Sequence, residues 1–403
     1  MTALRTVAII FIFFCSVIAW VILGGTLYRR TEAAKESATG AVRELWGTEQ
    51  YQRAPRFYYK VARTVGAKET VGKAVYLNPT SSDVKVKLHL DYRKKGLLWF
   101  STYVVEYFSD YRVKNYSTAP RKIYVEYRFP ATHALYDNFT FLVKNKQVQF
   151  PSPGADRIIT SAELAPGETA EVVIGYKSSG LDRWGYSFGE GVTRVRNFKL
   201  VAQTDFKDVD FPEGCVSPTA KEETDDGWVL TWQNKDLVTG YQLGVEMPKK
   251  LNPGPIASRM SFFAPVSLLF FFTVLFIISA VKADRVPPLH PMNYFFLAAA
   301  FFAFHVLFAY LADHVEIHLT FVISTLVSCL LVFVYVALAR GGRYALFYAT
   351  LPQFTTLILF SYAFFYRGYT GLIITIGSVA TLTFLMVATA RVDWAAKFGP
   401  KQS

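Results

Sequence analysis

The chain has 403 residues, of which 52% are apolar and 16% aromatic, and its formal net charge is +12. The basic residues are dispersed and form no compact basic stripe, so a nucleic-acid partner is not expected. Only three cysteines are present, and Cys15 and Cys329 lie in apolar runs. Cys215 therefore has no second thiol in the polar part of the chain, which excludes a disulfide-stabilised domain and a cysteine-ligated metal site there.

The first element is the apolar run Val7–Gly25, which is followed by Arg29 and Arg30. A cleaved signal peptide, with Thr31–Ala34 as the cleavage region, is one interpretation. The run is longer than an ordinary signal core, so residues 1–28 are predicted to be an uncleaved transmembrane anchor. Both interpretations export the residues that follow.

The segment 29–55 is rich in alanine and glutamate. Its apolar residues stand at Ala38, Ala41, Val42 and Leu45. This spacing predicts a short amphipathic stalk helix that leaves the membrane.

Residues 56–185 change to a two-residue period, in which apolar and polar side chains alternate. A turn signal at Pro166–Glu168 precedes one such run, and Lys144–Gln147 separates two others as in a hairpin. The predicted strands are Val84–Tyr92, Ile123–Phe129, Phe139–Val143, a run around Val148–Phe150, and Ala170–Tyr176. Short strands without helical patterns between them predict an exported, sandwich-like β domain.

The glycine-rich stretch Tyr186–Gly191 predicts a boundary between two domains. Beyond it, residues 186–255 are expected to form a smaller exported β domain. Its predicted strands are Val195–Gln203, Gly227–Gln233 and Tyr241–Met247.

The last third of the chain, residues 261–394, is predicted to be a transmembrane domain. Five apolar runs without a charged residue follow one another there: Phe262–Val281, Tyr294–Ala312, Ile317–Ala339, Tyr344–Tyr366 and Tyr369–Ala390. Each is long enough to cross a bilayer as a helix. The predicted fold class is therefore a mixed membrane protein: an N-terminal transmembrane helix, an exported all-β region and a C-terminal bundle of five transmembrane helices.

The charges between these runs predict the orientation, because cationic loops stay in the cytoplasm. The gap Asp313–Glu316 has no basic residue, whereas the first, third and fifth runs are followed by basic ones: Lys282, Arg285, Arg340, Arg343, Arg391, Lys397 and Lys401. Residues 29–260 are thus predicted to be periplasmic. Both termini, including the tail 395–403, are predicted to be cytoplasmic.

Several short motifs resemble the CreD family of inner-membrane proteins. They are Leu289–Tyr294 (LHPMNY), Ala312–His314 (ADH), Arg391–Trp394 (RVDW) and the Asp226–Trp228 (DGW) strand start. Phe263–Ser267 resembles a further motif of the family but lacks both of its acidic residues, so no role of those acids is carried over. The resemblance covers roughly residues 225–394. It implies an inner-membrane protein linked to envelope stress, and it implies no catalytic activity or cofactor.

His305 lies near the middle of its apolar run, where a titratable side chain is a candidate functional group. On a helix it shares a face with Ala298, Ala309 and Ala312, which favours contact with a neighbouring helix. One interpretation is a neutral imidazole that is hydrogen-bonded to a Ser, Thr or Tyr of that helix. The other is a group that handles protons or a ligand.

The segment after this run holds four potential metal ligands: Asp313, His314, Glu316 and His318. His314 and His318 would share a helix face if the next helix began one turn early, as zinc ligands can. The alternative interpretation is a solvated polar turn at the headgroup level. His305 would lie ~13 Å deeper along the helix and would not join them.

Three functions follow from these patterns. The first is a non-enzymatic envelope protein, anchored in the lipid bilayer, whose exported β domain contacts an envelope protein or polymer. The second is a small-molecule or ion transporter built from the five-helix bundle. The third and weakest is a metal-dependent membrane enzyme. The chain shows no nucleophile elbow and no paired intramembrane aspartates, so an enzyme is not expected.

Overall fold

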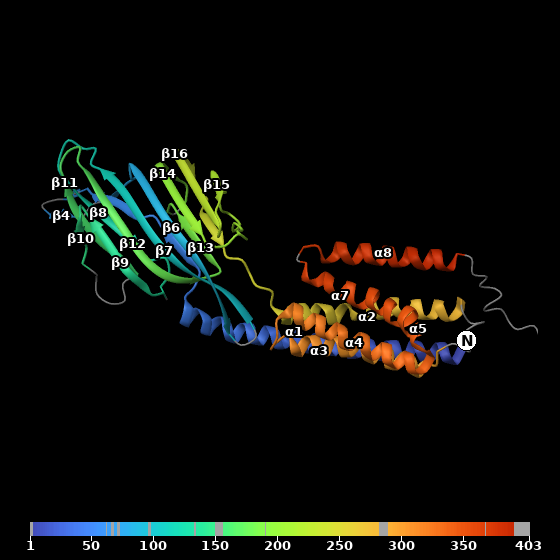
Figure 1. Cartoon of the computed structure of the whole chain (residues 1–403). Helices are drawn as coiled ribbons and strands as arrows, with labels where there is room; N and C mark the ends of the chain where they lie inside the picture. The colour runs from blue at the N-terminus through green and yellow to red at the C-terminus, as the bar shows by residue number, and fades with distance from the viewer. Residues whose placement is uncertain are drawn as a thin grey trace, which may run out of the picture. The chain divides into compact units, whose positions relative to one another are not determined.

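The computed structural model describes residues 3–61, 63–65, 68–70, 73–95, 98–132, 134–149, 156–189, 191–281, 289–366 and 368–390 (Figure 1). The basic residues Lys282 and Arg285, the Arg391–Trp394 motif and the tail 395–403 lie outside these residues. The chain divides into two compact units. We call Met1–Lys35 with Leu251–Ser403 the membrane unit, and Glu36–Lys250 the β unit.

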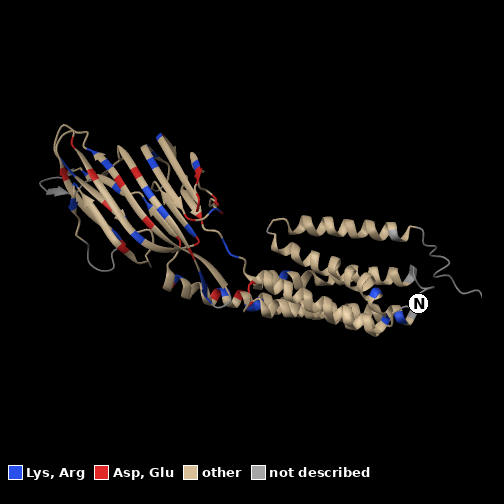
Figure 2. Ribbon diagram, viewed as in Figure 1, with Lys and Arg blue, Asp and Glu red and all other residues tan. Residues whose placement is uncertain are grey.

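The membrane unit is helical. Among the described residues, five helices are long and apolar enough to cross a membrane: α1 (Ala3–Trp46), α2 (Pro253–Val281), α3 (Pro291–Leu311), α4 (Ile317–Arg340) and α8 (Thr370–Thr389). Helices α2, α3, α4 and α8 carry almost no charge, whereas α1 is charged from Arg29 onwards and acidic and basic residues are scattered over the β unit (Figure 2). A long apolar N-terminal helix, a large β region and C-terminal apolar helices confirm the predicted fold class.

The fourth predicted C-terminal run, Tyr344–Tyr366, is not one continuous α-helix. It is a chain of short helical segments: α5 (Gly342–Ala345), η1 (Leu346–Thr350), α6 (Leu351–Gln353), η2 (Phe354–Leu359), α7 (Phe360–Tyr362) and η3 (Ala363–Phe365). The segments η1 and η2 are π-helical and flank Pro352. Proline lacks an N–H and its ring displaces the carbonyl four residues earlier, which favours the wider π-helical turns on either side of Pro352.

The predicted anchor and the predicted stalk are one continuous helix, α1, from Ala3 to Trp46. Mostly strong helix formers follow Arg30, and no proline interrupts them. Gly47, with a φ of +95°, ends the helix, and its N–H donates to the carbonyl oxygen of Arg43. The first strand starts three residues later, so the predicted stalk also ends too late.

The β unit contains seventeen strands within the described residues. They are β1 (Gln50–Arg53), β2 (Arg56–Lys60), β3 (Arg63–Val65), β4 (Lys68–Thr70), β5 (Ala74–Leu77), β6 (Ser81–Lys95), β7 (Leu98–Lys114), β8 (Arg121–Arg128), β9 (Tyr136–Val143), β10 (Lys146–Gln147), β11 (Arg157–Leu164), β12 (Thr169–Leu181), β13 (Arg183–Ser187), β14 (Thr193–Thr204), β15 (Ala220–Glu223), β16 (Trp228–Thr239) and β17 (Leu243–Glu246). The largest sheet has the order β10-β9-β12-β7-β6-β14-β16-β15. Two further sheets have the orders β11-β8-β2-β5 and β1-β13-β17, and β3 pairs with β4.

The predicted division of this region into domains 56–185 and 186–255 is wrong. Strand β14 pairs in parallel with β6, so strands from both predicted domains lie in one eight-stranded sheet. One apolar core also joins Phe57 and Tyr111 to Trp232 and Val245. The glycines of the supposed boundary form a turn instead, because Gly189 and Gly191 have positive φ values of 141° and 74°.

The core of the β unit includes buried polar groups that tie β1 to the other strands. The side-chain oxygen of Gln52 accepts hydrogen bonds from the hydroxyls of Tyr127 (3.2 Å) and Tyr176 (2.9 Å). The side-chain amide of Gln50 donates to the hydroxyl of Ser178 at 2.8 Å. Both glutamines are fully buried. Since buried polar groups are costly unless bonded, these contacts fix the position of a strand of only four residues.

Candidate functional site in the membrane unit

His305 is buried on α3 and faces the N-terminal helix. Its Nδ1–H donates to the carbonyl oxygen of Phe301 at 2.9 Å. Its ring meets the indole of Trp20 edge to face, with the ring centroids 5.7 Å apart. The sequence predicts a hydroxyl of a neighbouring helix as the hydrogen-bond partner, and this is wrong for Nδ1, which bonds within α3. The group of a neighbouring helix that the ring contacts is the indole of Trp20 on α1.

The contact between Trp20 and His305 brings together two groups of complementary chemistry. The bond to Phe301 requires the proton on Nδ1, so Nε2 carries a lone pair and can only accept. The indole Nε1–H of Trp20 can only donate. Among the described residues, neither atom has a hydrogen-bond partner. The two rings meet in the contact between α1 and α3.

A second group of polar side chains joins three segments of the membrane unit. The hydroxyl of Ser328 on α4 donates to the carbonyl oxygen of Ala300 on α3 at 2.8 Å. The side-chain amide of Gln353 on α6 donates to that same hydroxyl at 2.8 Å. Ser328 and Gln353 are fully buried. We call the chain of short segments from α5 to η3 the broken helix. These bonds hold it against α3 and α4, as polar residues do in helix packing within a bilayer.

The four potential metal ligands, Asp313, His314, Glu316 and His318, each make a different contact. Asp313 pairs with Arg30 of α1 at 2.5 Å. Glu316 accepts the backbone N–H of Leu319 and caps the start of α4. The ring of His318 packs 5.0 Å from that of Phe365, and the backbone N–H of His314 donates to Leu311. Within the part of the chain that the structure describes, no three His, Cys, Asp or Glu side chains lie where they could hold one metal ion.

Helix α1 is an integral part of the membrane unit. Trp20 and Leu27 are at most 1% exposed. The hydroxyl of Ser258 on α2 donates to the carbonyl oxygen of Gly24 at 3.0 Å. A Cβ at Gly254 would lie 2.3 Å from the side-chain oxygen of Thr31, so the two backbones can approach only because this residue is glycine.

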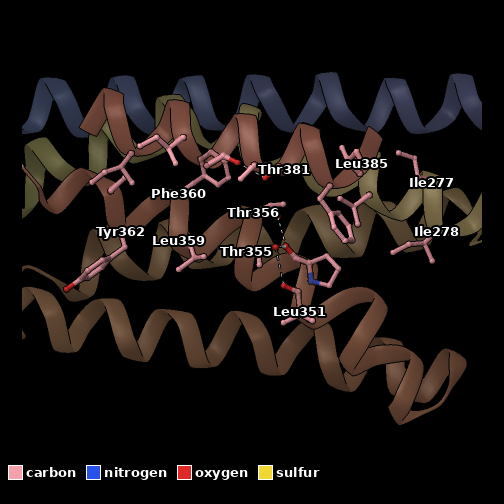
Figure 3. A pocket seen from close by; sticks show the side chains of 18 of the residues that line it. Ile277, Ile278, Leu351, Thr355, Thr356, Leu359, Phe360, Tyr362, Thr381 and Leu385 are labelled. Carbon is pink, nitrogen blue, oxygen red and sulfur yellow. Dashed lines mark hydrogen bonds between the residues drawn. The ribbon is translucent and has the colours of Figure 1, made fainter. Parts of the chain in front are cut away.

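A cavity of about 870 Å³ lies between α2, the broken helix and α8 (Figure 3). Most of its lining is apolar. Three threonines line it, and the hydroxyl of each donates to a carbonyl oxygen of its own helix: Thr355 and Thr356 to that of Pro352, and Thr381 to that of Gly377. His305 is not among the lining residues. The cavity therefore suits an apolar molecule.

Sequence reasoning identified His305 as a polar residue of the spans, but it missed Trp20 and the cavity. The signal for the cavity was present in two adjacent runs. Pro352 is followed three and four residues later by Thr355 and Thr356, and the last run contains Gly377 and Thr381. A proline-broken helix beside a helix of small residues leaves space, because wide turns and small side chains do not fill it.

The fold and these contacts define a multi-pass membrane protein that carries a large β-sheet unit. Residues 213–395 match the family model described as Inner membrane protein CreD. This part of the chain is CreD-like, which confirms the resemblance predicted for residues 225–394. The matched segment comprises the end of the β unit and α2 through α8.

No curated protein matches the chain. Among solved structures, a provisionally named nutrient binding protein from Legionella pneumophila is 10% identical, over 56% of this chain and 76% of its own, with a TM-score of 0.34. An M1 zinc metallopeptidase from Deinococcus radiodurans is 10% identical, over 77% of this chain and 90% of its own, with a TM-score of 0.22. Similarity at this level carries no argument about fold or function.

Proposed function

We propose that the protein is a non-enzymatic component of the cell envelope, in which the membrane unit is an anchor and the β unit contacts an envelope protein or polymer. The observation that carries this proposal is the use of polar groups at membrane depth. Ser328, Gln353 and Ser258 bond helix to helix, and His305 is enclosed by Phe301 and Trp20. Such contacts stabilise a bundle and need no substrate.

The orientation belongs to the same proposal: residues 29–260 are periplasmic and both termini are cytoplasmic. The cationic gaps support it, and so does the ion pair that Arg30 makes with Asp313, since it accounts for a basic residue on the outer side. Reporter fusions after Leu311 and after Lys282 test it. We expect the first to report the periplasm and the second the cytoplasm, and the opposite pattern would invert the topology.

The role in envelope stress is tested by complementation of a deletion strain. We expect the deletion to increase sensitivity to β-lactams or detergents, because the CreD resemblance links the family to such responses. The full chain should restore resistance, and a chain in which residues 50–250 are replaced by a flexible linker should not. A deletion without any effect on sensitivity would contradict the proposal.

A transporter is the second candidate, and the cavity beside α8 is the specific observation in its favour. Its apolar lining favours a lipid-like or other apolar solute over an ion. Gly377 lines the cavity, and a Cβ there would lie 3.3 Å from the ring of Phe360. Under this alternative, Gly377→Leu should abolish complementation while the protein still accumulates. Under the anchor proposal, that variant should complement normally.

A further inference from the structure

The apolar cavity between α2, the broken helix and α8 is elongated along the helices (Figure 3). On α8 its lining residues run from Ile373 to Leu385, which is ~18 Å of helix. Along the broken helix and the residue after it, they run from Phe347 to Tyr366. The cavity therefore follows more than half of a hydrocarbon core that is ~30 Å thick.

The cavity opens sideways, toward the surroundings of the membrane unit. Ile376 and Phe384 of α8 line it, yet they are 60% and 65% exposed. Leu359 of the broken helix is also a lining residue and is 55% exposed. The inner wall, by contrast, includes the buried residues Thr356 and Phe360. Because exposed and buried residues line the same space, a molecule can enter it from the side of the bundle.

Tyrosines line both ends of the cavity. Tyr348 lies near the start of the broken helix, and Tyr362 and Tyr366 lie at its end. Tyrosine prefers the interface between the hydrocarbon core and the headgroups, where its ring is in an apolar layer and its hydroxyl is wet. The part of the cavity between these tyrosines is therefore expected in the hydrocarbon core, where the surrounding medium consists of lipid acyl chains.

The lining favours an apolar occupant. None of the lining residues is charged, and the hydroxyls of Thr355, Thr356 and Thr381 already donate to carbonyl oxygens of their own helices. At about 870 Å³ the cavity is several times larger than an apolar cavity of ~150 Å³, which is enough to bind benzene. If it were empty, its lining would lose dispersion contacts on one side. A long apolar molecule would restore them.

Helix α8 is the least enclosed of the spanning helices in the described part of the chain. Only 6% of its most apolar window is buried, against 44% for α2. We propose that an acyl chain of a phospholipid from the surrounding bilayer occupies the cavity and completes the packing of α8 against α2 and the broken helix. An extended chain suits a space of this length, whereas a compact apolar solute would fill only part of it. The inference goes beyond both functions proposed above, because the chain contributes to packing whether the unit anchors or transports.

Photo-crosslinking of the full chain in detergent tests the proposal. The probe is phosphatidylethanolamine with a diazirine in the middle of one acyl chain, added as a small fraction of the detergent so that exposed surfaces mostly contact detergent. After irradiation, mass spectrometry locates the label. We expect several-fold more label on the cavity lining than on α4, where Leu326 and Leu330 are 64% and 61% exposed. Excess unlabelled phosphatidylethanolamine should remove the label from the cavity. Equal labelling of the cavity and of α4 would overturn the proposal.

Two neighbouring positions on α8 provide a matched pair of variants. Ala380 lines the cavity, whereas Val379 is 58% exposed and is not among the lining residues. Ala380→Phe should fill the space and remove most of the label from the cavity, and Val379→Phe should leave it unchanged. Gly377→Leu, which fills the same space from the preceding turn, should act as Ala380→Phe does. Its complementation of a deletion strain tests transport, whereas its labelling tests the lipid site, so the two ideas can fail separately. Label that survives both filling variants, or that Val379→Phe removes equally, would contradict the assigned site.

Discussion

Arg30 and Asp313 form an ion pair although 283 residues separate them in the chain. The guanidinium Nη2 lies 2.5 Å from the carboxylate Oδ2, and the guanidinium carbon Cζ lies over the ring of Tyr310, 5.4 Å from its centroid. Asp313 is 9% exposed and Arg30 is 33% exposed. The pair fastens the end of the spanning part of α1 to the turn between α3 and α4.

The first prediction concerns this pair. Arg30→Gln or Asp313→Asn alone should lower the thermal stability of the purified protein, because each leaves a largely buried charge without its partner. Since Arg30 is partly exposed, the coupling free energy in a double-mutant cycle should be about 1–3 kcal/mol. Arg29→Gln, at an exposed neighbour, is the matched control and should change little. A coupling near zero would mean that the pair contributes nothing to the packing of α1.

The second prediction is that α1 is retained in the mature protein. Its removal would expose the surfaces that bury Trp20 and Leu27. Intact mass spectrometry of protein purified from membranes should therefore give the full 45.5 kDa. A mass lower by the equivalent of the first thirty or so residues would show that the segment is a cleaved signal.

The third prediction concerns the ring contact between Trp20 and His305. If His305 has a structural role, His305→Phe should keep the ring contact and should complement a deletion strain. His305→Ala should cost about 2–4 kcal/mol, because it leaves a cavity. The coupling between Trp20→Phe and His305→Phe should be about 0.5–1.5 kcal/mol. A protonic role would give a different result: His305→Phe would abolish function while expression stays normal.

The fourth prediction concerns the buried side chain of Gln52. Gln52→Leu removes the acceptor of the hydroxyls of Tyr127 and Tyr176, which are then buried without a partner. We expect a loss of about 2–4 kcal/mol in the stability of the β unit. Gln203→Leu, on the exposed side of β14, should have little effect. Thermal unfolding followed by circular dichroism in the β-sheet region gives the comparison. Equal effects of the two substitutions would contradict the assigned role.

The fifth prediction concerns Cys215, a free thiol in the β unit. Burial raises the pKa of this thiol, and Arg183 opposes the shift to a smaller extent. Only the thiolate reacts, so alkylation at pH 8 should be slower than that of glutathione and should increase as the pH rises through the elevated pKa. Cys215→Ser should leave the melting temperature unchanged, since no disulfide depends on it. Fast alkylation at pH 8, or unfolding of the Cys215→Ser variant, would contradict these expectations.

The sequence predicted the β strands best where one face is polar. The alternation in Val84–Tyr92 and Ala170–Tyr176 lies within β6 and β12. The long strand β7 was not predicted, because Val104 and Phe108 on its outer face blur the alternation. Sequence patterns report burial on one face, so a strand that is apolar on both faces gives a weak signal.

Turns and sheet order depended on geometry that short-range patterns do not contain. The predicted four-residue connection Lys144–Gln147 is a two-residue turn, in which Lys144 and Asn145 have φ values of 52° and 61°. The parallel pairing of β14 with β6 joins residues that are more than a hundred positions apart. The contact between Trp20 and His305 was missing for the same reason: each side chain could be identified, but their meeting depends on how α1 packs.

The three-stranded sheet also sets an order of events during synthesis. Strand β13 lies between β1, the first strand of the β unit, and β17, the last. During synthesis, β1 cannot form its pairing until β13 has been made. One edge of β13 then has unpaired backbone groups until residues 243–246 have been made. Because α2 begins only a few residues later, at Pro253, closure of this edge and membrane insertion of α2 are almost simultaneous. Pairings of such high sequence separation form slowly, so the unit has an unprotected edge for most of its biogenesis. Slow insertion of α2 would prolong that interval and increase the exposure of the nascent chain to proteolysis and aggregation.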